Sequence, residues 1–160
     1  KVATLIIKSL QTGNKIIIFG NGGSAGDAQH MAAEFIGRFM KERKSFPAIA
    51  LSADSSIVTA LGNDYGFENI FSRQVESLIK KDDVIIAIST SGKSKNVLNG
   101  IKTGKKFGAK VISLTGNYTL KMKSTSDIIL NVPSSTTSRI QEAHRTIYHI
   151  ICELVEKSFL

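Results

Sequence analysis

Five short apolar runs, separated by segments of mostly helical periodicity, constrain the fold of this chain more than any other feature. They span residues 15–19, 46–51, 84–88, 110–114 and 128–132. Unbroken apolar runs of this length are typical of strands buried on both faces of a sheet. Parallel strands need long crossover connections, which helices usually provide with a right-handed sense. The sequence therefore predicts an α/β fold, a three-layer sandwich in which a five-stranded parallel sheet is flanked by helices.

Helical periodicity and capping signals predict the segments between these strands. We expect helices at about residues 2–10, 24–40, 55–61, 67–79, 94–107 and 138–159. Ser24 is the expected N-cap of the long second helix, and Asp27 in its first turn would favour the helix dipole. Residues 62–66, with the sequence GNDYG, are predicted to form a turn. Residues 41–45 are predicted to form a charged loop, and residues 121–126 a loop or a single helical turn.

Length and composition indicate one domain, residues 1–160, with a hydrophobic core. Of the 160 residues, 42% are hydrophobic and 21% are charged, which is ordinary for a globular domain. We expect no membrane partner, because no apolar run approaches the about 20 residues of a membrane span. The single cysteine, Cys152, excludes an internal disulfide, suits a reducing compartment and is expected to pack in the last helix. The chain begins at Lys1 within helical periodicity, so we expect its natural N-terminus to lie upstream.

The net charge of +8 does not by itself indicate a nucleic-acid partner. The basic residues are scattered along the chain, and no basic stripe is interleaved with aromatic residues. A positive field also suits a small phosphorylated substrate. We therefore expect no nucleic-acid partner and interpret most of the lysines as part of solvated faces.

The first Gly-rich turn, GNGGS at residues 20–24, follows the first predicted strand and precedes the long helix. Such a turn offers free backbone N–H groups to an anion or a sugar hydroxyl. Residues 20–25 also fit the G-x-G-x-x-A pattern of dinucleotide-binding proteins. That pattern requires an acid at the end of the second strand, about 20 residues further on. The nearest acid beyond the second strand is Asp54, which follows too long a helix for a good match, so a dinucleotide site is disfavoured.

His30 and Glu34 follow the Gly-rich turn at a spacing of i, i+4. This spacing places an imidazole and a carboxylate on one face of the predicted helix. The two groups are suited to proton transfer or to binding a divalent metal. The alternative is a solvated i, i+4 pair on the helix surface, which the two residues alone do not exclude.

Four hydroxyls crowd the turn between the third strand and the next helix. They belong to Ser89, Thr90, Ser91 and Ser94. Hydroxyls, free N–H groups and the positive end of a helix together form a phosphate-binding site, to which Lys93 would add charge if it points inward. The alternative is a polar loop with Ser94 as an ordinary N-cap, but four hydroxyls in six residues exceed what capping needs. A nucleoside triphosphate is not indicated, because the Lys93-Ser94 pair is not preceded at the Walker spacing by the first Gly of that motif.

Two further motifs have both a structural and a functional interpretation. Asn63 and Asp64 can hydrogen-bond to sugar hydroxyls, or they can simply form the turn. In the last helix, Gln141 and His149 lie about 12 Å apart along the helix axis. They can join one metal ion only by leaning toward each other, or if different chains of an oligomer each supply one.

Together these motifs resemble the phosphoheptose isomerases, a family with the sugar isomerase (SIS) fold. The likeness rests on GNGGS at 20–24, HMAAE at 30–34, GNDYG at 62–66, STSGKS at 89–94, RIQE at 139–142 and His149. The motifs occur in the family's order and cover essentially the whole chain. The family usually carries a further N-terminal helix, which is mostly absent from this sequence.

The resemblance implies a fold, an assembly and a reaction. It implies a flavodoxin-like topology in a cytoplasmic homotetramer with active sites at the subunit interfaces. The implied enzyme converts sedoheptulose 7-phosphate to D-glycero-D-manno-heptose 7-phosphate through an enediol(ate). The product would enter the bacterial heptoses of lipopolysaccharide or capsule.

Residue by residue, the resemblance implies a substrate site, a metal site and an acid–base pair. Phosphate binding is implied for Ser89, Thr90, Ser91 and Ser94. Further substrate contacts are implied for Asn21, Gly22, Gly23, His30, Glu34, Asn63, Asp64 and Gln141. One zinc ion per subunit is implied at His30, Glu34, Gln141 and His149. Glu34 and His149 also match the family's proposed base and acid. They cannot be full zinc ligands and free acid–base groups at the same instant, so either the ligation is loose and exchanges with substrate or the roles are divided differently.

Two other SIS proteins are alternatives to the enzyme. One is a non-catalytic relative that binds a sugar phosphate and acts as an adaptor in the control of replication initiation. Such relatives resemble this chain through Gln141 and His144, but they are not expected to keep both Glu34 and His149. The other is a sugar-phosphate-sensing regulatory domain, which is normally fused to a DNA-binding or catalytic module that these 160 residues lack. The presence of both Glu34 and His149 favours the enzyme.

Overall fold

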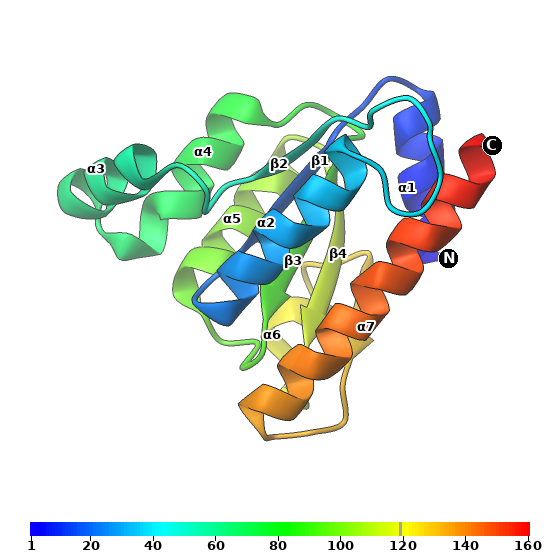
Figure 1. Ribbon diagram of the computed structural model, residues 1–160. Helices are drawn as coiled ribbons and strands as arrows, with labels where there is room; N and C mark the ends of the chain where they lie inside the picture. The colour runs from blue at the N-terminus through cyan, green and yellow to red at the C-terminus, as the bar shows by residue number, and fades with distance from the viewer. Residues whose placement is uncertain (119) are drawn as a thin grey trace.

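The computed structural model of this chain (Figure 1) describes residues 1–118 and 120–160. Within these residues a five-stranded sheet has the order β2-β1-β3-β4-β5, and every strand pair is parallel. The strands are β1 (Ile16–Gly20), β2 (Ala48–Ala50), β3 (Val84–Ser89), β4 (Lys110–Thr115) and β5 (Ile128–Asn131). This is the strand order of the flavodoxin-like folds, so the predicted sheet is confirmed.

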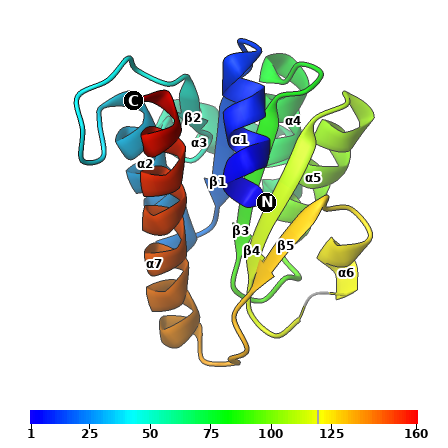
Figure 2. The same ribbon diagram turned by 90° about the vertical axis from the view of Figure 1, so that its right-hand side faces the viewer.

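Helices cover both faces of the sheet, as Figures 1 and 2 show. One face carries α1 (Val2–Gln11), α2 (Gly23–Ile36) and α7 (Thr137–Glu156), and the other carries α4 (Ile70–Leu78) and α5 (Lys95–Lys106). The other described helical segments are α3 (Ser55–Tyr65), η1 (Phe67–Asn69), α6 (Leu120–Lys123) and η2 (Lys157–Phe159). The three-layer sandwich is thereby confirmed. Among the described helices, none has the length and apolar character needed to cross a membrane.

Alternate residues of each central strand pack into two separate hydrophobic cores. In β1, Ile16 and Ile18 face α1, α2 and α7, whereas Ile17 and Phe19 face α4 and α5. This division explains why the strand is an unbroken apolar run. Cys152 packs in the first core as predicted, and burial raises the pKa of its thiol to about 12, so the group stays protonated.

Helix α2 differs from its predicted bounds at both ends. It begins at Gly23, and its N-cap is Gly22. The backbone at Gly22 has a φ of 56°, a conformation that favours glycine. Ser24, the predicted N-cap, lies inside the first turn instead. The helix ends at Ile36 and not at residue 40, and its last carbonyl groups accept hydrogen bonds from Arg43.

The prediction of a turn at residues 62–66 is wrong. Helix α3 continues through Tyr65 and ends at Gly66, which has a φ of 83°. Gly and Asn inside a helix each cost no more than about 1 kcal/mol, so they do not stop a helix that has a good start. Asp54 gives it that start by accepting a hydrogen bond from the Ile57 N–H at 3.0 Å. Strand β2 is also shorter than predicted, Ala48–Ala50 in place of residues 46–51.

The carboxyl ends of β1 and β3 bring two predicted motifs to one edge of the sheet. Gly20 pairs in register with Ile88, so the Gly-rich turn and the hydroxyl-rich turn are neighbours. The side-chain amides of Asn21 and Asn96 exchange two hydrogen bonds of 2.9 and 2.8 Å, which tie the Gly-rich turn to the first turn of α5. Open parallel sheets bind their ligands at this edge.

Candidate active site

His30, Glu34 and His149 form a compact cluster where α2 packs against α7. Their potential ligand atoms all lie within 4.8 Å of one another. His30 Nε2 lies 2.9 Å from Glu34 Oε1, as the i, i+4 spacing allows. The His149 ring meets the His30 ring edge-on, with the ring centroids 5.1 Å apart. Two imidazoles and a carboxylate at this separation can hold a divalent metal or transfer protons.

The donor set of this cluster fits a metal ion. His149 Nε2 is buried and has no hydrogen-bond partner among residues 1–118 and 120–160. Leaving a buried polar group unpaired costs about 1–3 kcal/mol. A divalent cation bound to the cluster would give this nitrogen a partner. Imidazole nitrogen and carboxylate oxygen are ligands that zinc takes in proteins.

A hydrogen-bond network through the buried residues Tyr148 and Asp27 holds His30 from the side opposite Glu34. Tyr148 Oη lies 3.0 Å from His30 Nδ1 and 3.3 Å from Asp27 Oδ1. Arg145 Nη2 donates to the same Asp27 oxygen at 3.1 Å. Burial and the charge of Asp27 raise the pKa of Tyr148 to about 12, so its hydroxyl keeps its proton at neutral pH. The network fixes the His30 ring with Nε2 directed at Glu34.

The prediction that Asp27 lies in the first turn of the helix and favours its dipole is wrong, because α2 begins at Gly23 and Asp27 is beyond the first turn, where it makes these contacts instead. Asp27 is only 2% exposed, and a buried carboxylate requires donors from elsewhere in the fold. One signal was available, because Asp27, His30 and Glu34 recur at i, i+3 and i+7 on one face of the helix. Its partner Tyr148 carried no such signal, since it belongs to the buried stripe of α7, and Arg145 lies beside that stripe.

The hydroxyl-rich turn lies at the N-terminus of α5. Ser89 Oγ and Ser94 Oγ are 3.1 Å apart, and Ser91 Oγ accepts a backbone N–H at 3.2 Å. Thr90 fixes the turn through its carbonyl oxygen, which accepts the N–H of Gly116 at 3.1 Å. Ser94 occupies the N-cap position of α5, but in the described structure its hydroxyl makes no capping hydrogen bond. The hydroxyls and the positive end of the helix are therefore suited to an anion.

The Gly-rich turn contacts Gln141 of α7. A Cβ on Gly23 would lie 2.3 Å from Gln141 Nε2, so glycine leaves the space that this side chain fills. Gly23, Asp27 and Gln141 line a hollow of about 260 Å³. Gln141 stands two helical turns, about 12 Å along the axis, before His149. Its described contact is thus with the Gly-rich turn.

Asn63 and Asp64 lie on α3, on the opposite side of the molecule from α7 (Figure 1). Asn63 Nδ2 donates to Asp64 Oδ1 at 2.8 Å, and both side chains are exposed. Helix α3 packs against η1 and α4, and none of its residues is buried. Within one chain, these two residues are therefore not brought to the His30–Glu34–His149 cluster.

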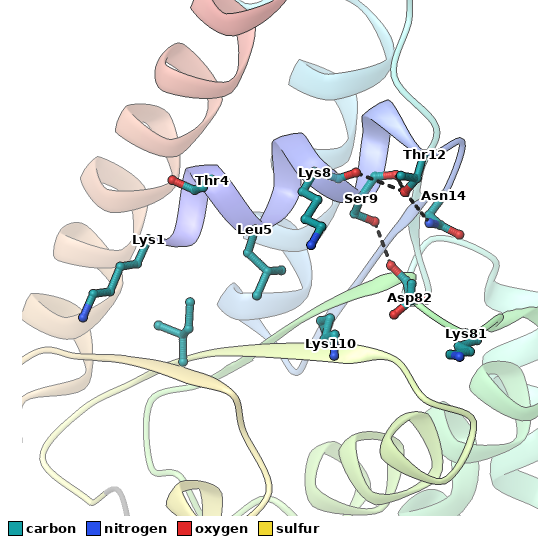
Figure 3. A pocket seen from close by; sticks show the side chains of 11 residues that line it. Lys1, Thr4, Leu5, Lys8, Ser9, Thr12, Asn14, Lys81, Asp82 and Lys110 are labelled. Carbon is teal, nitrogen blue, oxygen red and sulfur yellow. Dashed lines mark hydrogen bonds between the residues drawn. The ribbon is translucent and has the colours of Figure 1, made fainter.

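A hollow of about 920 Å³ lies at the other edge of the sheet. Figure 3 shows it between α1 and the chain near Asp82 and Lys110, with Lys1, Lys8 and Lys81 around it. Asp82 precedes β3 and Lys110 begins β4, so the hollow is at the amino ends of the strands. It contains none of the predicted site residues, and ligands of such sheets bind at the carboxyl ends.

Similarity to known proteins extends over nearly the whole chain. The SIS domain family matches residues 1–116. The phosphoheptose isomerase of Aquifex aeolicus is 55% identical over 98% of this chain and 82% of its own length. The structure of phosphoheptose isomerase GmhA from Neisseria gonorrhoeae has a TM-score of 0.91 and 42% identity, covering 97% of this chain and 83% of that one. A phosphoheptose isomerase from Francisella tularensis has a TM-score of 0.93 and 38% identity, with the same coverage of 97% and 83%.

The match over most of the sheet makes this chain an SIS-domain protein. A shared fold alone does not show a shared family, because unrelated activities occur on one fold. The identity of 55% along nearly the full length of the chain is evidence beyond the fold. Within the SIS class, the chain belongs to the phosphoheptose isomerase family. The resemblance stated from its motifs is confirmed.

Proposed function

We propose that this chain is an aldose–ketose isomerase that converts sedoheptulose 7-phosphate to D-glycero-D-manno-heptose 7-phosphate. The observation that carries the proposal is the cluster of His30, Glu34 and His149 in a member of the phosphoheptose isomerase family. The product would supply heptose for bacterial lipopolysaccharide or capsule. No observation favours the replication adaptor, and the cluster keeps the two residues that such an adaptor is not expected to need.

The reaction moves one proton between C1 and C2 and another between the two oxygens. The Glu34 carboxylate takes the proton from C1 of the ketose, which gives an enediol(ate), and returns it to C2. The His149 imidazole moves the oxygen-bound proton. His30 does not need to move a proton. In the metal-free protein it holds Glu34 Oε1 through the 2.9 Å contact, while Tyr148 holds His30 in turn.

The same cluster would hold one zinc ion per subunit through His30, Glu34 and His149, with Gln141 as a fourth ligand. The unpartnered Nε2 of His149 supports this assignment. When bound, zinc would polarise the substrate carbonyl as a Lewis acid. Gln141 contacts Gly23, two turns from His149, so it would join the set from a neighbouring subunit or after a side-chain movement.

A homotetramer with active sites at the subunit interfaces is part of the proposal. Helix α3 supports it. None of its 11 residues is buried, and two of its large hydrophobic side chains, Ile57 and Tyr65, are 42% and 51% exposed. A neighbouring subunit on α3 would cover these side chains and bring Asn63 and Asp64 to a substrate. A cytoplasmic location is a prediction from the same family resemblance.

The isomerase is tested by incubating the metal-analysed protein with sedoheptulose 7-phosphate in deuterated water and following the sugar by NMR. We expect an aldose heptose 7-phosphate with deuterium at C2, and deuterium exchanged into C1 of the ketose, because an enediol exchanges its carbon-bound proton with solvent. Binding of the ketose without conversion would contradict the isomerase and favour the adaptor.

A second prediction concerns the hydroxyl-rich turn. Replacing Ser91 and Ser94 together by Ala should raise KM about 10²- to 10⁴-fold, because each hydrogen bond to a charged group contributes about 1.5–3 kcal/mol. Lys93 would not compensate, since its ammonium lies over the Tyr118 ring, 4.0 Å from the centroid. Steady-state kinetics measures the effect, with circular dichroism to show that the fold is kept.

Ser72→Ala is the matched control for this double variant. The Ser72 hydroxyl donates to the Asn69 carbonyl at 3.1 Å on α4, so its loss should leave KM unchanged. An unchanged KM for the double variant as well would remove the phosphate-binding role from the turn.

A further inference from the structure

A segment without helix or strand, residues 37–46, follows α2 and begins three residues after Glu34; we name it the strap. A single carboxylate from the end of α7 holds it. Glu156 Oε1 accepts the N–H of Phe39 at 2.8 Å, and Oε2 accepts those of Met40 and Lys41 at 2.7 and 2.9 Å. Glu156 is 2% exposed, so these hydrogen bonds are shielded from water.

Arg43 of the strap completes the attachment. Its Nε lies 3.4 Å from Glu156 Oε1, and its side chain is 3% exposed. Burial alone would raise the pKa of Glu156, but the three backbone N–H groups and the Arg43 charge outweigh it and lower the pKa. Glu156 is therefore ionised at neutral pH, and the two side chains form a buried ion pair.

The Arg43 guanidinium also closes the C-terminal end of α2. It donates to the carbonyl oxygens of Glu34 at 2.7 Å, Phe35 at 2.8 Å and Gly37 at 2.9 Å. Carbonyl groups in the last turn of a helix have no partner within the helix, so they need such a donor. One of these carbonyls belongs to Glu34, the proposed catalytic base.

The strap reaches His149 as well. The Phe39 ring lies 5.6 Å from the His149 ring, centroid to centroid. Glu156, which holds the Phe39 N–H, stands two turns after His149 on the same helix. The Arg43–Glu156 pair is thus connected to Glu34 through a backbone hydrogen bond and to His149 through the Phe39 ring.

From these contacts we infer that Arg43 and Glu156 are positioning residues for the isomerase site. They set the distance between the carboxylate of Glu34 on α2 and the imidazole of His149 on α7. The inference rests on the isomerase proposed above. It predicts a loss of kcat with little change in KM, because the hydroxyl-rich turn of α5 makes none of the strap contacts described here.

Asp83 provides a matched control, because it is also a buried carboxylate that accepts backbone N–H groups and pairs with a cation. It is 1% exposed and accepts the N–H groups of Lys15 at 2.9 Å and Lys80 at 2.6 Å, and it pairs with the Lys15 ammonium. Asp83 lies just before β3, at the edge of the sheet away from the site. Removing its charge disturbs folding without touching the strap.

The test compares Glu156→Gln with Asp83→Asn in the full chain. Both variants should lower Tm, since each leaves buried N–H groups with a poorer acceptor. Glu156→Gln alone should lower kcat, by about 100-fold if the catalytic groups shift by 1 Å, with KM within about twofold of wild type. Equal kcat values for the two variants would overturn the positioning role.

Arg43→Lys keeps the inference testable if Glu156→Gln does not fold. Lysine keeps the charge beside Glu156 but lacks the planar fork that reaches several carbonyls, including that of Glu34. We expect a fall in kcat with KM unchanged, and wild-type kcat would overturn the role of Arg43. Wild-type protein that binds the ketose without converting it would instead overturn the proposed function, so the two failures are distinguishable.

Discussion

Glu34→Gln should lower kcat by about 10²- to 10⁴-fold, while binding of the sugar phosphate persists. The amide keeps the size of the side chain and an oxygen for the 2.9 Å contact with His30, but it cannot take a proton from carbon. The hydroxyl-rich turn, which is proposed to bind the phosphate, is unchanged. The substitution therefore separates the proposed roles of Glu34, proton transfer and zinc binding, from binding of the phosphate.

Deuterium exchange into C1 of the ketose is the most direct measurement for this variant. Exchange reports the first proton transfer even when product formation is slow. We expect exchange to stop together with turnover, while the affinity for the ketose, measured by calorimetry, stays within a few-fold of wild type. Turnover within tenfold of wild type would show that Glu34 is not the base.

Glu153→Gln is the matched control for Glu34→Gln. Glu153 is a carboxylate of α7 that pairs with Lys157 at 2.6 Å on the surface. An exposed i, i+4 pair contributes about 0.3–0.5 kcal/mol, so its loss should change neither turnover nor exchange. A similar loss in both variants would indicate a general effect of charge and would remove the specific role of Glu34.

The sheet could be predicted from the sequence because each strand carries its own signal. Ile85 and Ile86 face different cores, and both are fully buried, so the apolar run of β3 needs no knowledge of its neighbours. The turn at residues 62–66 could not be placed correctly. Gly62 and Asn63 weaken a helix locally, but α3 continues to Gly66, where the backbone takes a φ of 83°.

The candidate site also has a part that the sequence predicts locally and a part that depends on how the helices pack. His30 and Glu34 are four residues apart, so their pairing follows from the helix alone. Their contact with His149 depends on how α7 packs on α2, and only the family resemblance predicted that His149 joins them. Contacts such as Phe39 with Glu156 join residues 117 positions apart, and no local pattern in the sequence predicts them.

His149→Phe should abolish turnover and metal binding while leaving the metal-free protein at least as stable as wild type. The ring keeps its packing against Phe39, but the variant loses the buried Nε2 that has no partner among the described residues. Removing an unpaired buried polar atom relieves a cost of about 1–3 kcal/mol. Loss of the proposed acid should lower kcat by about 10²- to 10⁴-fold.

Thermal unfolding with and without zinc measures the metal site independently of activity. A free zinc concentration of 100 times Kd stabilises a protein by about 2.7 kcal/mol. For a chain of this size that corresponds to a rise in Tm of about 5–10 °C in the wild type. His149→Phe should show little or none of this rise. An undiminished rise would place the metal elsewhere, and a less stable metal-free variant would show that Nε2 has a partner.

His144→Phe is the matched control, because His144 is a second buried histidine of α7. Its Nε2 lies 3.2 Å from the carbonyl oxygen of Thr115, and it is not part of the cluster formed by His30, Glu34 and His149. Burial lowers the pKa of His144, so the ring is neutral and donates to that carbonyl. His144 Nδ1 is likewise buried without a partner among the described residues, and the Thr115 carbonyl also accepts the Val132 N–H at 2.8 Å, so His144→Phe should change Tm little and keep the rise that zinc produces. Loss of the zinc-induced rise in Tm for His149→Phe but not for His144→Phe would assign the metal to His149.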